Sequence, residues 1–293
     1  MAFKENLNTK SAYIEDLLKE YMPKEEGYQK TIFEAMNYSL SAGGKRLRPI
    51  LTLEATKIVG GDEKEAVPFA MAIEMIHTYS LIHDDLPCMD NDDLRRGKPT
   101  NHKVYGEDIA VLAGDTLLNE AMNLMMKFSL KHGKEALMAA QKIAEASGPE
   151  GMIGGQIVDI INEGKKISEE ELKYMHMKKT GALINVSIIS GAILANAPKE
   201  DINLLEKFGE KLGLAFQIKD DILDVIGSTE KLGKNVLSDK ENDKTNFITM
   251  HGLDYCIKEC ENLTNESIKI LDSLSVDTEA LKFLTKKLLD REN

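Results

Sequence analysis

The sequence predicts an all-α fold. Apolar residues recur at spacings of three and four, the period of a helix with one buried face, in eight runs along the 293 residues. Strand signals are scarce, because β-branched residues fall inside these helical patterns and no Asn-Gly hairpin separates alternating segments. Aromatic residues make up only 5% of the chain, while Met, Leu, Ile, Ala, Glu and Lys dominate, which favours helices. We therefore expect a single domain over residues 1–293, a bundle of roughly ten or more helices.

Turn-forming residues separate several of the helical runs. The runs cover residues 32–40, 66–82, 109–130, 137–146, 183–194, 202–225, 257–274 and 281–289. Gly, Pro and Asn interrupt the pattern at residues 60–62, 97–99, 147–149 and 196–198. Ser168 and Glu171 have capping-box spacing, and Asp277-Thr278 can cap the last helix. Residues 182–194 are apolar nearly all round, which predicts a helix buried on all sides or packed against another subunit.

Composition limits the classes of function. The chain carries 37 basic and 49 acidic residues, a net charge of −12, which argues against nucleic-acid binding. The three cysteines provide neither a disulfide framework nor a Cys/His metal spacing. We expect no membrane span, because no apolar run reaches about 18 residues. The first residues lack the apolar core of a signal peptide, so we expect a cytoplasmic protein.

An acidic segment follows the apolar run 66–82. Asp84, Asp85 and Asp90 lie close together there, although a bare acidic cluster is more often a solvated helix end than a site. On a straight helix Asp84 and Asp90 would lie about 240° apart. Pro87 disfavours continued helix, so the chain can turn and bring Asp90 back toward Asp84.

A second acidic segment favours a binding site over a solvated helix end. Asp220 and Asp224 lie four residues apart, on one face of an otherwise apolar helix, with Asp221 beside them. Carboxylates in such surroundings are costly unless a cation neutralises them. Hard oxygen ligands favour Mg²⁺, which commonly binds one or two carboxylates together with substrate phosphates.

Basic residues provide candidate phosphate ligands. Arg95 and Arg96 follow the first acidic segment, and guanidinium groups suit bidentate phosphate binding. Lys45 and Arg48 lie in a Gly-Gly-Lys-Arg-Leu-Arg-Pro segment that leads into a helix, although basic residues at such junctions are commonly surface residues. His77 precedes Asp84 by seven residues, which places it on nearly the same helix face. A lone His is more often a core residue, but this one is a plausible phosphate donor.

Two glycines precede a further pair of polar residues. Gly154 and Gly155 fit a close approach of two helices better than a nucleotide-binding loop. The roles of Gln156 and Asp159 stay open at this point.

Taken together, these motifs resemble the trans-prenyltransferases of the isoprenoid diphosphate synthase family, in particular its bacterial farnesyl and geranylgeranyl diphosphate synthases. The resemblance covers roughly residues 40–245. The matching positions are Gly43-Gly-Lys45-Arg-Leu-Arg48-Pro, Asp84, Asp85, Asp90, Arg95-Arg96-Gly, Gly155-Gln156, Lys179-Thr180-Gly, Gln217, Asp220, Asp221, Asp224 and Leu-Gly-Lys234.

The resemblance implies an isoprenoid synthase fold with a deep central cavity, normally a homodimer, in which the two acidic motifs face each other. Three Mg²⁺ ions would join the six aspartates to the diphosphate of an allylic substrate. The residues expected to complete that allylic site are Arg95, Lys179, Thr180, Lys234 and, with a less certain register, Lys244, while Gln217 would face the allylic end. Those expected to hold isopentenyl diphosphate are Lys45, Arg48, His77 and Arg96.

The expected reaction is ionisation, condensation and elimination. Cations stabilise the departing diphosphate, apolar walls exclude water, and the alkene of isopentenyl diphosphate attacks the allylic carbocation. Tyr79 and Ser80 lie five and four residues before Asp84, which places Tyr79 about 7 Å from Asp84 along the helix axis. The alternative is that Tyr79 is an ordinary core residue. In the family an aromatic residue there accompanies the fifteen-carbon product, so we expect (2E,6E)-farnesyl diphosphate from dimethylallyl and geranyl diphosphate.

Three alternatives to this function stay open. Geranylgeranyl diphosphate synthase is the nearest, because it uses the same chemistry to make a longer product. A non-catalytic helical partner subunit is less favoured, because every expected acidic and basic position is filled. A terpene cyclase is disfavoured by the second Asp-Asp-x-x-Asp motif.

Overall fold

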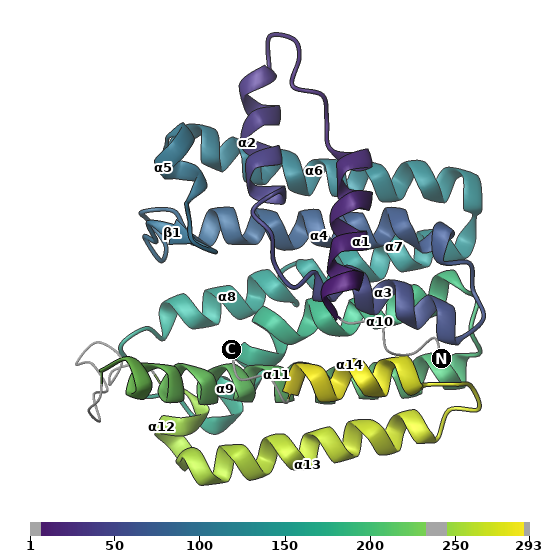
Figure 1. Ribbon diagram of the computed structural model, residues 1–293, viewed down its shortest axis with the longest axis vertical. Helices are drawn as coiled ribbons and strands as arrows, with labels where there is room; N and C mark the ends of the chain where they lie inside the picture. Colours follow the sequence, from purple (N-terminus) through teal and green to yellow (C-terminus); the bar gives the residue numbers. More distant parts are fainter. Residues whose placement is uncertain (1–6, 233–244, 290–293) are drawn as a thin grey trace. The chain divides into compact units, whose positions relative to one another are not determined.

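The computed structural model describes residues 7–232 and 245–289, and these are predominantly helical (Figure 1). The elements in chain order are α1 Leu7–Tyr21, α2 Lys30–Leu40, α3 Leu47–Ile58, α4 Glu63–Asp84, β1 Leu94–Arg95, β2 Lys98–Pro99, α5 Asn101–Tyr105, α6 Glu107–His132, α7 Lys134–Ser147, α8 Met152–Ile161, α9 Glu169–His176, the π-helical segment η1 Met177–Gly181, α10 Ala182–Leu194, α11 Lys199–Leu232, α12 Phe247–His251, α13 Leu253–Asp272 and α14 Glu279–Leu289. The predicted all-α class is confirmed.

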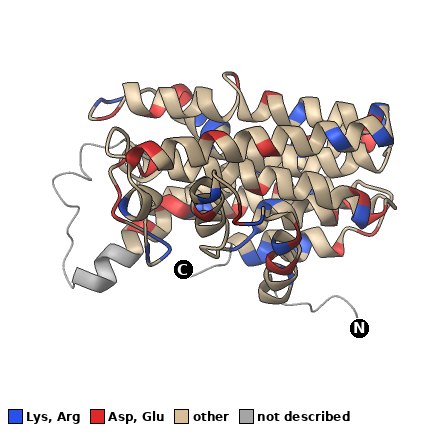
Figure 2. Cartoon of the chain, turned by 90° about the horizontal axis from the view of Figure 1, so that it is seen from above, with Lys and Arg blue, Asp and Glu red and all other residues tan. Residues whose placement is uncertain are grey.

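The chain divides into two compact units. The first contains residues 1–141 and 193–195, and the second contains residues 142–192 and 196–293. Figure 2 shows lysines and arginines (blue) and acidic residues (red) scattered among other residues along the described helices. No helix in the described part of the chain is both long enough and apolar enough to cross a membrane.

Helix α4 forms the centre of the first unit, packed against α3 and α6 (Figure 1). Every side chain from residue 66 to residue 76 is buried, which fits a helix enclosed by neighbours rather than one with a solvated face. Its start is fixed by Asp62, whose side chain accepts a hydrogen bond from the Lys64 N–H at 2.9 Å. The helix ends at Asp84, so the first acidic motif begins at the end of a buried helix.

Helix α11 has the same role in the second unit, where it packs against α13, α14 and η1. Phe208, Leu212, Ala215, Ile218 and Ile222 are buried at the three- and four-residue spacing expected of one apolar face. The second acidic motif lies in this same helix. A closely packed helix therefore supports each of the two motifs, enclosed on all sides in α4 and amphipathic in α11.

Several local predictions are confirmed. The chain breaks at all four Gly/Pro/Asn sites, and Ser168 and Glu171 form a capping box at the start of α9. Helix α10 is buried along nearly its whole length, from Leu183 to Ile193 apart from half-buried Asn185. Of the two readings of this apolar helix, burial within its own chain is the observed one.

A short antiparallel hairpin is the main feature that the helical pattern did not predict. Strands β1 and β2 pair Leu94 with Pro99 and Arg95 with Lys98. Both loop residues have positive φ, 54° at Arg96 and 76° at Gly97, as a two-residue hairpin with this twist requires. Two-residue strands are too short to show an alternating pattern, so only the Arg-Gly pair could have indicated this turn.

Arg46 has a structural role in the first unit. It lies in the left-handed region at the start of α3, with φ 48°, and its side chain is fully buried. The guanidinium donates to Glu15 at 2.7 Å, to Glu74 at 2.5 Å and to the Leu40 carbonyl. Since Glu74 is only 2% exposed, removing Arg46 would leave its carboxylate buried without this partner.

We therefore predict that Arg46→Ala lowers the free energy of unfolding by about 3–5 kcal/mol, the usual cost of removing one partner of a buried ion pair. The midpoint of urea unfolding measures this loss. Lys30→Ala is the control, because the Lys30–Glu34 pair on α2 is largely exposed to solvent and its loss should leave the midpoint almost unchanged. Equal shifts in the two variants would contradict the structural role of Arg46.

Candidate functional site

The first acidic motif lies in a turn that directly follows α4. The Asp90 N–H donates to the Asp84 carbonyl at 2.8 Å, and the Asn91 N–H donates to the Leu86 carbonyl at 3.1 Å. The predicted return of Asp90 toward Asp84 is therefore confirmed. Asp84 is half-buried, Asp85 is buried and Asp90 is exposed, so the three carboxylates differ sharply in their surroundings.

Asp85 is held by the hairpin that follows this turn. Arg95 on β1 donates from Nε to Asp85 Oδ1 at 2.9 Å, and its terminal nitrogen contacts the same oxygen. The same guanidinium reaches Asp92 at 3.2 Å. Burial raises the pKa of Asp85, and the hydrogen bond and charge of Arg95 oppose that rise. Arg95, predicted as a phosphate ligand, thus also positions a carboxylate of the first motif.

The second acidic motif has a buried carboxylate at its centre as well. Asp221 Oδ2 accepts a hydrogen bond from the Phe247 N–H of α12 at 3.0 Å, and Oδ1 accepts from the Gln217 amide at 3.3 Å. Burial raises the pKa of Asp221 to about 6, although both hydrogen bonds oppose the shift. Asp220 is half-buried and Asp224 is exposed. The two motifs thus share an order of half-buried, buried and exposed carboxylates.

This donor set fits Mg²⁺ better than a transition metal. Among the described residues, no three His, Cys, Asp or Glu side chains are arranged to hold a metal by themselves. Mg²⁺ does not need such a cage, because it retains water and binds one or two carboxylates together with phosphate oxygens. Each motif provides oxygen donors of this kind, with one carboxylate fixed and others accessible.

Positive charge gathers beside the first motif, in a cationic cluster made of Arg48, His77, Arg95 and Arg96. Burial and the charges of Arg48 and Arg96 hold the pKa of His77 well below its usual range, so its imidazole is neutral at pH 7. Arg96 also donates to the Gly43 carbonyl. Gly44 has φ 133°, a conformation that disfavours other residues, and a side chain there would also displace the Arg96 guanidinium.

The cationic cluster joins three of the four residues predicted to hold isopentenyl diphosphate. An anion bound there would offset the charges of Arg48 and Arg96, which add to burial in lowering the pKa of His77. The fourth predicted residue, Lys45, is exposed at the start of the same loop-to-helix junction.

In the second unit, Lys179 forms an ion pair with Asp159 of α8, with Nζ and Oδ2 2.6 Å apart. Lys179 and half-buried Thr180 belong to η1, and π-helical segments occur frequently at functional sites. A Cβ at Gly155 would overlap the backbone of Lys178 and Lys179, so this glycine permits the close approach of α8 and η1. The prediction of a close helix approach is confirmed for Gly155, whereas a Cβ at Gly154 would mainly meet the Pro149 carbonyl of the preceding turn. Asp159 gains a partner in Lys179.

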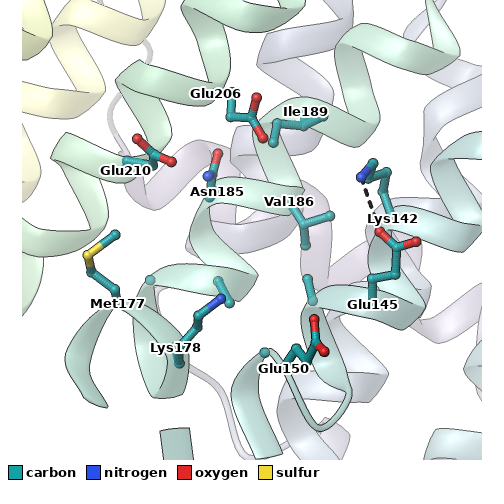
Figure 3. A pocket seen from close by; sticks show the side chains of 14 residues that line it. Lys142, Glu145, Glu150, Met177, Lys178, Asn185, Val186, Ile189, Glu206 and Glu210 are labelled. Carbon is teal, nitrogen blue, oxygen red and sulfur yellow. Dashed lines mark hydrogen bonds and ion pairs between the residues drawn. The ribbon is translucent and has the colours of Figure 1, made fainter. Parts of the chain in front are cut away.

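A hollow of about 340 Å³ lies beside η1 (Figure 3). Lys178 of η1 lines it together with Asn185 of α10 and Glu206 and Glu210 of α11. The described residues that line it include none of the predicted substrate-binding side chains. Successive lysines of η1 thus have different environments.

Tyr79, the predicted determinant of product length, is 6% exposed on α4. Burial, together with the charge of Asp84, raises the pKa of its hydroxyl to about 12. The hydroxyl has no hydrogen-bond partner among the described residues. Ser80, next to it, donates to the His77 carbonyl at 2.9 Å.

Some predicted residues could not be placed, and some contacts were not foreseen. Lys234 and Lys244 lie outside the described residues. The Phe247 N–H was missed because a backbone donor gives no signal in the residue type. The Asp159–Lys179 pair depends on the contact between α8 and η1, and Gly155 is the only sequence feature that indicated this contact.

Comparison with known proteins identifies the class as a prenyltransferase. The profile of the family described as "Polyprenyl synthetase" matches residues 29–284. The chain is 50% identical to the farnesyl diphosphate synthase of Bacillus subtilis over 78% of this chain and 81% of that protein. It is 44% identical to the geranylgeranyl diphosphate synthase of Cyanophora paradoxa, over 87% and 85% of the two chains.

A solved structure agrees with these sequence matches. The crystal structure of an FPP/GFPP synthase from Zymomonas mobilis superposes with a TM-score of 0.82 at 35% identity, covering 96% of this chain and 95% of the other. The chain belongs to the polyprenyl synthetase family and has its all-α isoprenoid synthase fold. The family predicted from the acidic and basic motifs is confirmed.

The packing of α8 on η1 gives a prediction about stability. Gly155→Ala should lower the free energy of unfolding by about 1–3 kcal/mol, because the added methyl group overlaps backbone atoms that cannot rotate away. Thermal unfolding of the purified variant measures the change.

Gly181→Ala, in η1 itself, is the matched control. A Cβ there meets its nearest atom, the His176 carbonyl oxygen, at 3.5 Å, which is ordinary contact. We expect Gly181→Ala to change the unfolding temperature little. A Gly155→Ala variant as stable as this control would show that the close approach of α8 and η1 is not required.

Proposed function

We propose that this chain is a farnesyl diphosphate synthase that condenses isopentenyl diphosphate with dimethylallyl diphosphate and then with geranyl diphosphate. The observation that carries the proposal is the presence of two acidic motifs, each with one buried carboxylate, in a chain with a cationic cluster beside the first motif. The similarity to the Bacillus subtilis enzyme supports the same reaction.

The six motif aspartates are proposed to bind Mg²⁺ together with the allylic diphosphate, three ions for each active site. Enzymes of this family use Mg²⁺. Arg95, Lys179 and Thr180 complete the allylic site in this proposal, with Lys234 and Lys244 from outside the described residues. The buried members Asp85 and Asp221 are fixed by Arg95 and by the Phe247 N–H, so they provide oriented ligands at little further entropic cost.

The second substrate, isopentenyl diphosphate, is assigned to Lys45 and to Arg48, His77 and Arg96 of the cationic cluster. The arginines offer bidentate contacts to phosphate, and neutral His77 can donate one N–H. In this proposal the allylic diphosphate binds at the metal-binding aspartates, and isopentenyl diphosphate binds at the basic side chains.

The proposed residues contribute to each stage of the reaction. When bound, Mg²⁺ neutralises the charge that develops on the leaving diphosphate. Arg95 and Lys179 add positive charge at the same group, while Gln217 faces the allylic end as the carbocation forms. The alkene of isopentenyl diphosphate attacks that cation to form the new carbon–carbon bond. One proton is then lost to the released diphosphate, so no dedicated protein base is required.

Product length is assigned to Tyr79 and Ser80 on α4. A buried ring one and a half turns before Asp84 would act as a floor that stops the growing chain at fifteen carbons. The alternative is a geranylgeranyl diphosphate synthase, which the similarity to the Cyanophora paradoxa enzyme favours. The greater identity to the Bacillus subtilis enzyme supports the shorter product.

The remaining assignments are also proposals. A single domain over residues 1–293 is supported by the family match, which extends across both compact units. A homodimer is supported by large apolar side chains that α6 leaves exposed, among them Leu112, Met126 and Leu130. Location in the cytoplasm stays a prediction from the sequence.

The central test uses the first aspartate of each motif. Asp84→Asn and Asp220→Asn should each lower kcat/KM by roughly 10²–10³, because each removes charge that stabilises the departing diphosphate through Mg²⁺. EDTA should stop turnover by the unmodified protein, and added Mg²⁺ should restore it. Incorporation of labelled isopentenyl diphosphate into extractable product measures both effects.

Asp16→Asn is the matched control, since this aspartate of α1 is exposed and pairs only with Lys19 among its described contacts. Its activity should equal that of the unmodified protein. Absence of turnover in the unmodified protein with Mg²⁺ would instead favour a non-catalytic partner subunit.

The floor assignment makes its own prediction. Tyr79→Ala should shift the main product from fifteen to twenty carbons or more, because removal of the ring opens space along α4. Chromatography of dephosphorylated products measures the shift. Tyr79→Phe keeps the ring and should keep the fifteen-carbon product. A Tyr79→Ala variant that still stops at fifteen carbons would show that Tyr79 is not the floor.

A further inference from the structure

His83 lies one turn after Tyr79 on α4 and faces α6. Its Nε2 is 3.1 Å from the Val111 carbonyl oxygen. A carbonyl can only accept, so in this contact Nε2 carries the hydrogen. Asp115, also on α6, approaches the same nitrogen at 3.9 Å. The imidazole is therefore attached to the neighbouring helix as well as to its own.

Gly114 creates the space for this contact. A Cβ at this position would overlap the Nε2 and two carbon atoms of the His83 ring. The absence of a side chain lets the imidazole lie directly on the backbone of α6. Because a hydrogen bond fixes one ring edge and the α6 backbone limits movement, the ring has little freedom.

The fixed imidazole in turn contacts Tyr79. The two rings meet edge to face, with centroids 5.7 Å apart and planes at 74°. This geometry is favourable for aromatic pairs, and residues four apart on a helix share one face. The Tyr79 hydroxyl has no hydrogen-bond partner among the described residues, so packing orients its ring rather than polar contacts.

From this chain of contacts we infer that His83, held in place by Gly114 and the Val111 carbonyl, is a positioning residue that sets product length by fixing the ring of Tyr79. The inference rests on the proposed function, in which Tyr79 is the floor. His83 is assigned no contact with substrate. Its removal lets the Tyr79 ring move into the vacated space, so that elongation past fifteen carbons competes with product release.

The test compares the products of His83→Ala with those of the unmodified protein, using isopentenyl and dimethylallyl diphosphate with Mg²⁺. We expect the ratio of twenty- to fifteen-carbon product to rise roughly two- to tenfold. This factor corresponds to the free energy of one edge-to-face aromatic contact. His83→Gln keeps an N–H donor for Val111 but lacks the ring, and it should shift the ratio in the same direction. This second variant covers the case in which His83→Ala fails to fold.

His132→Ala is the matched control. His132 stacks on Phe128 with centroids 3.7 Å apart, so its removal also deletes a contact between an imidazole and an aromatic ring four residues earlier. That pair lies at the other end of α6, and the product ratio should stay unchanged.

The outcomes separate the inference from the proposed function. If Tyr79→Ala lengthens the product but His83→Ala and His83→Gln do not, the positioning role is overturned and the floor stands. If none of the three changes the product, the floor itself is wrong and the inference falls with it. An equal shift in His132→Ala would show that the effect is a general loss of packing and would also overturn the positioning role.

Discussion

Buried negative charge is the constraint on which the rest of this structure depends. Each acidic motif places one carboxylate, Asp85 or Asp221, where water is largely excluded, and burial raises the pKa of both. The protein compensates with specific donors: the Arg95 guanidinium for the first, the Phe247 N–H and the Gln217 amide for the second. Such an arrangement favours binding of cations, because they offset the remaining repulsion among neighbouring carboxylates.

The supporting elements follow from that constraint. Helices α4 and α11 hold their motifs in place, and two short elements, β1 and α12, carry Arg95 and Phe247, which donate to the buried carboxylates. The hairpin brings Arg95 to Asp85 and aims Arg96 at the Gly43-Gly44 loop. In the second unit, Lys179 of η1 pairs with Asp159, while Lys178 lines the hollow shown in Figure 3. Loops and a π-helical segment thus supply the orientation that regular helices do not.

How far the sequence could predict this structure depended on the range of the interaction. Helices such as α4 and α6 were predictable from apolar spacing, and the turn at Pro87 from the conformational limits of proline. The acidic motifs were evident because clustered carboxylates in apolar helices are unusual. Contacts between distant residues, such as those of His83 with Gly114 and Asp159 with Lys179, leave no periodic signal. A backbone donor such as the Phe247 N–H cannot be read from residue type at all.

The proposed function requires that Mg²⁺ ions held by the two acidic motifs bind the same diphosphate. A crystal structure of the protein with Mg²⁺ and inorganic diphosphate tests this requirement most directly. We expect Mg²⁺ ions at Asp84 and at Asp220 that bind one common diphosphate. A structure in which these aspartates point to opposite sides of the molecule, with no common hollow and the diphosphate bound at only one motif, would contradict it.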